Sequence, residues 1–281
     1  MLMVVAVLLV FGLVLGSFVN ALVYRLHEQQ LLSNKKSAAA KKQLQKLSIM
    51  KGRSMCSSCG HQLAAIDLVP VLSWLWLRGK CRYCKRKISD SSLVELIVPA
   101  LFLFSYYFWS MTFRGSGLFD FILWLIFLVG FVALAVYDLR WKLLPNRIVY
   151  PLITLAVIQV LVTATFYHKG WHALLGAIWG ILIAAGLFYV LFELSRGRWI
   201  GGGDVKLAVV LGILVGGPTQ AVLMLFMASV LGTAFSLPLI AIGKLRRNSQ
   251  VPFGPFLLFA TIIAYIFGSS IIGWYKHLLV G

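Results

Sequence analysis

Long apolar runs dominate the chain, and most charged positions gather between them. Eight such runs can be separated along the 281 residues. An α-helix needs about 20 apolar residues to cross a hydrocarbon core of about 30 Å, and most of the runs have that length. The pattern predicts an all-α polytopic membrane protein with about eight transmembrane helices. The expected spans are residues 2–24, 93–112, 119–137, 148–167, 171–194, 205–215, 221–242 and 256–274.

One long polar segment interrupts this pattern and divides the chain into three parts. We expect a first transmembrane helix at residues 1–24, a small cytoplasmic insert at 25–92 and a membrane domain at 93–281. No basic residue precedes the first run, and its length suits a span better than the short core of a signal peptide. We therefore expect the first run to be retained.

Composition and charge distribution agree with a lipid environment. Hydrophobic residues make up 60% of the chain and charged residues 12%, which is unusual for a soluble domain. The net charge of +18 would also suit nucleic acid, but 23 of the 26 basic residues fall in inner loops if the N-terminus is outside; Arg114, Lys169 and Lys276 are the exceptions. The positive-inside rule then predicts both termini outside. The excess charge indicates orientation and contact with anionic lipid, and no nucleic-acid partner is expected.

All four cysteines lie in the insert as two CxxC pairs. Cys56 and Cys59 form the first pair, Cys81 and Cys84 the second, and 21 residues separate the pairs. Two such knuckles place four thiolates around one Zn²⁺ ion, as in a zinc ribbon. Two disulfides or four free thiols are the alternatives, and a cytoplasmic location disfavours disulfides. His61 is a further possible ligand, although four cysteines suffice.

Two other stretches of the insert carry a structural prediction. Residues 68–77, between the knuckles, are apolar but too short to span a bilayer. We expect them either to pack on the zinc module or to lie in the membrane interface. Residues 29–51 are rich in Lys, Gln, Ala and Ser and favour a solvated helix or a mobile arm.

Two of the eight acidic residues stand apart from the others. Asp138 and Asp204 each adjoin the same end of an apolar run, and an ionised carboxylate costs about 2.5–3.5 kcal/mol at the centre of a membrane. Pro145 follows the first aspartate and would stop or kink a helix. Gly201, Gly202 and Gly203 precede the second, and glycines let a backbone approach closely or adopt a positive φ. The two residues are functional candidates on the same side of the membrane.

A pair of neighbouring carboxylates has a specific chemistry. Both cannot easily ionise in a partly dry site, so one keeps its proton while the other activates a water held between them. This arrangement hydrolyses peptides without a metal at the site. In the alternative interpretation, Asp138 and Asp204 are unrelated and each pairs with a neighbouring Arg or Lys.

Several motifs, in order along nearly the whole chain, resemble those of the bacterial type IV prepilin peptidases. The segment that begins at Asp138 is similar to the first aspartate motif of this family, and Gly201–Asp204 to its GxGD element. The remaining matches are Gly16-Ser17-Phe18-Val19-Asn20, the two CxxC pairs, Leu77-Arg78-Gly79-Lys80-Cys81 and Val251-Pro252-Phe253-Gly254-Pro255.

The resemblance implies an enzyme of the bacterial inner membrane with its active site at the cytoplasmic face. It would remove the basic leader from type IV prepilins and from pseudopilins of type II secretion, after a glycine. By motif, Asp138 and Asp204 are the catalytic residues, with no metal, and Gly201, Gly203 and Lys206 support them.

The resemblance also implies methylation of the new N-terminal amine with S-adenosylmethionine. The insert and its flanking helices are associated with this step, and Asn20, Gly79, Lys80 and Glu95 match the pattern there. Glu95 either binds the substrate amine or is a carboxylate favoured by the helix dipole. Two positions depart from the family: Asn146 replaces an acidic residue, and Asp90-Ser91-Ser92 replaces Arg-Tyr-Pro in the methylation region.

Three rival functions follow from the same residues. The first is a leader peptidase alone, whose zinc domain is structural. The second is a transporter or channel that uses membrane aspartates, but the spans contain few other polar residues. The third is a membrane-tethered zinc-ribbon module that binds nucleic acid, which leaves both aspartate motifs without a purpose.

Overall fold

The structure is a computed structural model, and it describes most of the chain. The described residues are 1–33, 44, 47–48, 52, 54–56, 58–87, 91–109, 113, 115–166, 170–244 and 251–280. Within them, the named elements are all helices, and two isolated β-bridges occur in the insert. The chain divides into two compact units, Met1–Tyr107 and Phe108–Gly281. The expected all-α class is confirmed.

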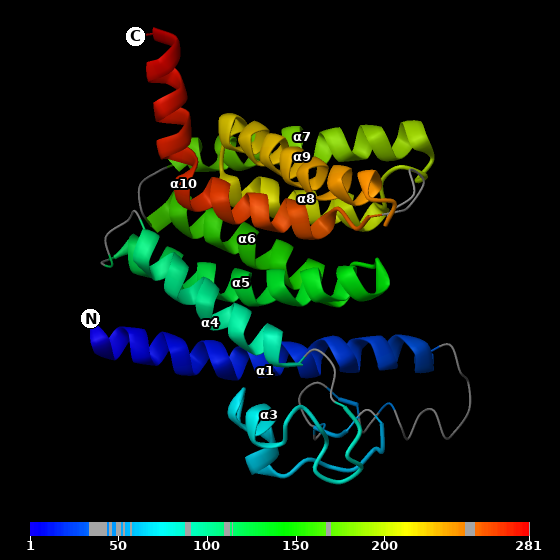
Figure 1. The fold of residues 1–281 in the computed structure, drawn as a ribbon. Helices are drawn as coiled ribbons and strands as arrows, with labels where there is room; N and C mark the ends of the chain where they lie inside the picture. The colour runs from blue at the N-terminus through cyan, green and yellow to red at the C-terminus, as the bar shows by residue number, and fades with distance from the viewer. Residues whose placement is uncertain are drawn as a thin grey trace. The chain divides into compact units, whose positions relative to one another are not determined.

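The first unit contains the insert and the helices on either side of it (Figure 1). Its elements are α1 (Leu2–Ser33), the 3₁₀ helix η1 (Ala65–Leu68), α3 (Leu72–Trp76) and α4 (Ser91–Phe108). Two glycines let α1 and α4 meet through their backbones. A Cβ at Gly12 would lie 2.5 Å from Cα of Pro99, and one at Gly16 would lie 2.7 Å from Cα of Glu95. Any larger residue would separate the helices, and such close approach is how membrane helices gain packing contacts.

The polar end of α1 holds the start of the insert. Arg25 is buried and donates hydrogen bonds to the carbonyl oxygens of Ser48, at 3.2 Å, and Gly52, at 2.9 Å. Gln29 donates to the carbonyl oxygen of Leu47 at 2.7 Å. Most of the arm expected at residues 29–51 lies outside the described residues.

The second unit consists of six helices, with the shortest at its centre. They are α5 (Ser116–Trp141), α6 (Asn146–Phe166), α7 (Gly170–Ser195), α8 (Gly202–Val215), α9 (Pro218–Ala241) and α10 (Gly254–Val280). Helix α8 packs against α6, α7, α9 and α10, and Figure 1 shows it between α9 and α6. Most of its side chains after the first turn are buried. Packing against these four helices therefore holds the residues in the first turn of α8 in place.

Glycines at matching positions bring α7 and α8 together. Gly180 of α7 faces Gly212 of α8, and Gly176 of α7 faces Gly216, the residue that follows α8. The two glycines on each side are four positions apart. A Cβ on Gly212 would lie 2.6 Å from the carbonyl oxygen of Gly180. This spacing of small residues allows backbone contact between membrane helices.

A buried polar contact joins three helices of the second unit. Gln159 of α6 donates from Nε2 to Oδ1 of Asp120 on α5 at 3.0 Å, and both side chains are buried. Tyr265 of α10 lies against both residues, and its ring stacks on Trp124 with centroids 4.2 Å apart. Hydrogen bonds of this kind hold membrane helices together. Asp120 therefore has a packing role.

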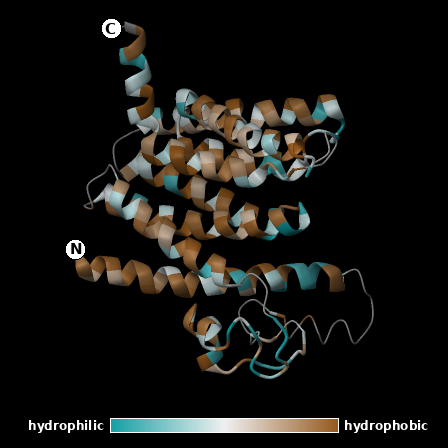
Figure 2. Ribbon diagram, in the orientation of Figure 1, coloured by the Kyte–Doolittle hydropathy of each residue, from teal (hydrophilic) through white to brown (hydrophobic). Residues whose placement is uncertain are grey.

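The eight apolar runs expected from the sequence all become helices, and six of these are long and apolar enough to span a membrane. Within the described residues, the six are α1, α5, α6, α7, α9 and α10. Figure 2 shows hydrophobic residues around most of their circumference, as expected for helices in lipid. Helices α4 and α8 are shorter: the 14 residues of α8 rise only about 21 Å.

Candidate functional site

The first aspartate sits where α5 ends. Lys142 takes the left-handed conformation, with φ 54°, and its N–H bonds to the carbonyl oxygen of Asp138 at 2.8 Å. Pro145 then leads into α6, so the motif forms the turn between two helices. The side chain of Asp138 is buried. Its Oδ2 is buried and has no hydrogen-bond partner among the described residues, which is unusual for a buried oxygen.

The second aspartate lies in the first turn of α8. The N–H of Asp204 bonds to the carbonyl oxygen of Gly201 at 3.0 Å, and the helix N-terminus favours a carboxylate at this position. Gly201 has φ −76°, so the expected freedom to take positive φ is not used there. Close approach occurs instead at Gly203, where a Cβ would lie 3.1 Å from Cβ of Leu144. The glycine run thus lets α8 pack against the turn that follows Asp138.

These two turns bring Asp138 and Asp204 together although they are 66 positions apart in the sequence. Their carboxylates are close enough to act on each other electrostatically. A third segment closes the site, because Gly254 begins α10 against Asp138. From the sequence, Gly254 had no predicted role. Its place in the family-like motif at 251–255 was the only sequence signal that pointed to it.

The side chain of Lys206 contacts the start of α6. Its Nζ donates to Oδ1 of Asn146 at 3.1 Å and lies 5.5 Å from the centre of the Tyr150 ring. Asn146 is the position at which the chain departs from the family pattern, and it anchors Lys206 here. The interpretation in which Asp204 pairs with its neighbouring lysine therefore gains no support.

The four cysteines converge as expected for a metal centre. The sulfur atoms of Cys56, Cys59, Cys81 and Cys84 all lie within 4.8 Å of one another. A tetrahedral Zn²⁺ with bonds of about 2.3 Å needs sulfur atoms about 3.8 Å apart, and Cys56 and Cys84 are 3.9 Å apart. The donor set therefore fits zinc.

The two knuckles have the same backbone form. The N–H of Gly60 bonds to the carbonyl oxygen of Cys56 at 2.9 Å, and that of Lys85 to Cys81 at 3.0 Å. Gly60 and Lys85, which each follow a second cysteine, both have positive φ. An isolated β-bridge flanks each knuckle. His61 is not part of the sulfur cluster, since its ring packs 3.7 Å from that of Tyr83.

The thiols of the cluster resist full ionisation without a cation. Burial opposes ionisation of Cys56, but the backbone N–H groups of Cys59 and Ser58 outweigh it and lower the pKa of that thiol to about 7. For Cys84, the Arg86 N–H favours the thiolate, yet burial and the adjoining Cys59 and Cys81 raise the pKa to about 11. Four thiolates at one point need a bound metal ion to offset their repulsion.

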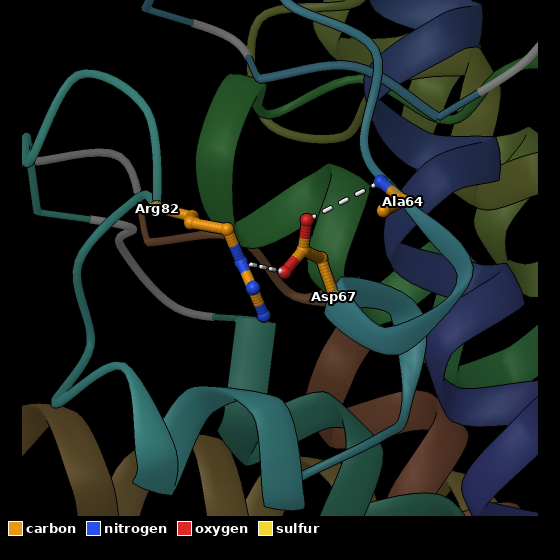
Figure 3. A network of polar contacts seen from close by, with 3 residues as sticks. All are labelled: Ala64, Asp67 and Arg82. Atoms are coloured by element: carbon orange, nitrogen blue, oxygen red, sulfur yellow. Dashed lines mark hydrogen bonds and ion pairs between the residues drawn. The ribbon is translucent and has the colours of Figure 1, made fainter.

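An ion pair between an exposed arginine and a shielded aspartate connects the segment between the knuckles to the second knuckle. Arg82 donates from Nε to Oδ1 of Asp67 at 2.7 Å, and the N–H of Ala64 donates to Oδ2 at 3.2 Å. Figure 3 shows Asp67 between these two donors. The side chain of Asp67 is only 3% exposed, so its charge is neutralised within the insert.

The four residues associated with methyl transfer lie in the first unit. Glu95 is buried, and its Oε2 accepts the N–H of Val71 at 2.7 Å. Gly79 has φ 69°, and a Cβ there would lie 3.2 Å from the Trp74 ring. Lys80 follows and is exposed, while Asn20 lies on α1. Glu95 is thus committed to a backbone group, which neither of the two sequence-based roles anticipated.

Comparison with known proteins gives the same assignment over nearly the whole chain. Residues 10–109 match the model of the bacterial peptidase A24 N-terminal domain, and residues 125–237 match the type IV leader peptidase family. The chain is 32% identical to a prepilin leader peptidase/N-methyltransferase of Aeromonas salmonicida, covering 94% of this chain and 91% of the relative. It is 30% identical to one of Bacillus subtilis, covering 98% and 99%. No solved structure matches.

The matched regions contain both aspartates and all four cysteines. The aligned region covers more than nine tenths of each of these relatives. The protein is therefore a multi-pass membrane protein that belongs to the type IV leader peptidase family, the peptidase A24 family of aspartic proteases.

Proposed function

We propose that this protein is a prepilin leader peptidase and N-methyltransferase in which Asp138 and Asp204 cleave the leader. The observation that carries the proposal is the meeting of these two carboxylates, one at the end of α5 and one at the start of α8. The names of the full-length relatives support the substrate class. Prepilins and pseudopilins with a basic leader are the expected substrates.

The pair works as general acid and general base. The ionised carboxylate takes a proton from the attacking water, whose oxygen bonds to the scissile carbonyl carbon, while the protonated carboxylate donates to the carbonyl oxygen. The C–N bond then breaks, and the departing nitrogen takes a proton from the pair. Gly201, Gly203 and Lys206 support the geometry by fixing the turns beside the pair.

Both aspartates face the cytoplasmic side in the proposed topology. Eight spans, including the short α4 and α8, place both termini outside and the insert inside. The distribution of basic residues supports this orientation. Arg114, Lys169, Arg246 and Arg247, which enter that distribution, lie outside the described residues.

Methyl transfer belongs to the first unit, with S-adenosylmethionine as the methyl donor. This donor would supply an electrophilic methyl group: its S–CH₃ bond would break as the new N-terminal amine of the pilin bonds to the methyl carbon, and the amine would lose a proton. Asn20 and Glu95 offer oxygen acceptors for an ammonium or amine group, and Gly79 and Lys80 follow α3. A Zn²⁺ ion on the four cysteines holds the insert together. In the alternative, the enzyme is a peptidase only and this domain is structural.

The decisive experiment is co-expression with a prepilin and measurement of the intact mass of the product. Asp138→Asn and Asp204→Asn keep the shape of each side chain but remove the acid–base group, so either variant is expected to leave the leader in place. Asp120→Asn is the matched control, because Asp120 lies at the other end of α5 and retains an acceptor for Gln159. Full cleavage by either of the first two variants would overturn the dyad.

The same measurement separates the two activities. A product that lacks its leader and carries one additional methyl group supports the bifunctional enzyme. Leader loss without the methyl group supports the peptidase alone. Glu95→Gln is expected to lose the methyl group while it keeps leader cleavage, because Glu95 lies in the first unit and the aspartate pair in the second.

A further inference from the structure

Part of the insert lies beside the middle of α1. Glu95 of α4 binds the N–H of Val71 at 2.7 Å and also contacts the side chain of Ser17 on α1. Ser17 precedes Arg25, the first charged residue of α1, by eight residues, which is about 12 Å along the helix. Val71 is therefore anchored at a depth where α1 carries no charge.

The segment around Val71, residues 65–77, presents large apolar side chains outward. Trp76 is 84% exposed and Leu72 is 64% exposed. The other exposed members are Ile66, Leu68, Val69 and Leu75. No charged residue occurs between Asp67 and Arg78. A contiguous exposed patch of this kind marks an interaction surface.

Several backbone N–H groups of this segment are hydrogen-bonded within the protein. The N–H groups of Leu72, Ser73, Leu75 and Leu77 bond to carbonyl oxygens within the segment. The N–H of Val71, which has φ 60° and so cannot continue a regular helix, is bonded by Glu95. Backbone groups in hydrocarbon must be satisfied within the protein. Glu95 therefore completes a turn that can enter lipid.

Charge is confined to the two ends of the segment. At the first end, Asp67 is neutralised by Arg82 (Figure 3). At the second end, Arg78 and Lys80 are both exposed. Basic residues beside an apolar surface attract anionic lipid headgroups, at about 1 kcal/mol for each residue near the surface. The polarity of the segment thus matches the boundary between hydrocarbon and headgroups.

We infer that residues 65–77 form a re-entrant wedge whose partner is the lipid of the leaflet on the insert side. The exposed side chains of η1 and α3 contact acyl chains, and Arg78 and Lys80 lie among the headgroups. The insert then contacts α1 at two depths. Arg25 binds it in the polar part of α1, and Glu95, which contacts Ser17, binds it in the apolar part. Residues 68–77 were expected either to pack on the zinc module or to lie in the membrane interface, and the wedge corresponds to the second position.

Photocrosslinking of the full chain tests this wedge. The photoreactive residue p-benzoylphenylalanine replaces Trp76 in one variant and Tyr83 in another, and each protein is reconstituted in vesicles of phosphatidylethanolamine and phosphatidylglycerol. Tyr83 is the matched control, since it is an exposed aromatic residue on the second knuckle. After irradiation, the intact mass of the Trp76 variant is expected to rise by one phospholipid, and that of the Tyr83 variant is expected to stay unchanged.

The alternatives give other products. Equal lipid adducts at both positions, or none at Trp76, would overturn the wedge. A crosslink from Trp76 to another part of the same chain leaves the intact mass unchanged and is identified as a joined pair of peptides after digestion; it would overturn the wedge by showing that protein covers the surface. An adduct that forms only with added prepilin would assign the surface to the substrate. In a third variant, p-benzoylphenylalanine replaces Leu72, so that the result does not depend on one position. A phospholipid adduct at Leu72 as well supports the wedge.

Discussion

Gly254 at the start of α10 lies directly against Asp138 at the end of α5. A Cβ added to Gly254 would stand 2.5 Å from Oδ2 of Asp138, closer than real Cβ atoms approach an oxygen. That oxygen has no hydrogen-bond partner among the described residues. Gly254 therefore lets the start of α10 pack against a buried oxygen of Asp138, where any larger residue would collide with the carboxylate.

Gly254→Ala is expected to impair cleavage without unfolding the protein. The methyl group would displace the Asp138 carboxylate, and a misplacement of about 1 Å in a catalytic group can cost on the order of 100-fold in rate. The measurement is the rate of prepilin cleavage in detergent. Gly273→Ala is the control, because Gly273 lies on the same helix with open space around its Cβ position. Equal rates for both variants would contradict this role.

Gly212→Ala is expected to destabilise the second unit. The new methyl group would meet the backbone of α7 at Gly180, and overpacking of this kind costs about 1–3 kcal/mol. The measurement is the thermal unfolding temperature in detergent, which should fall. Gly186→Ala on α7 is the control, since nothing lies within 4 Å of its Cβ position. A Gly212 variant as stable as this control would argue against the backbone contact.

Zinc affinity is expected to rise with pH. The pKa of the Cys84 thiol is raised to about 11 without metal, so this group is protonated near neutral pH and must release its proton when Zn²⁺ binds. The apparent affinity should increase about tenfold per pH unit for each proton released. Competition with a chromogenic chelator between pH 6 and pH 8 measures this slope. A flat profile would mean that the thiols do not ligate the metal.

The zinc prediction also has a variant form. Cys84→Ser is expected to reduce bound zinc from one ion per chain to none, because a hydroxyl replaces one of four thiolate ligands. Elemental analysis of the purified protein measures the metal content. Ser58→Ala, within the first CxxC pair but not a ligand, should retain its zinc.

The residue pattern alone predicted the chemistry and its order along the chain. Hydrophobic run lengths predicted eight apolar helices because lipid imposes a minimum length on a span. The CxxC spacing predicted the sulfur cluster, since both pairs form local turns. Asp138 and Asp204 stood out because a carboxylate beside an apolar run is costly and therefore rare.

Which of these elements meet could be seen only in the folded protein. The membrane helices are apolar around most of their circumference (Figure 2), so periodicity could not show which faces touch. The contacts of α8 depend on glycines such as Gly180 and Gly212, whose importance appears only when two backbones approach. In the same way, the roles of Gly254 beside Asp138 and of Glu95 beneath Val71 arise from residues far apart in sequence. A lipid-facing sequence fixes the length and depth of a helix, whereas backbone proximity selects its neighbours.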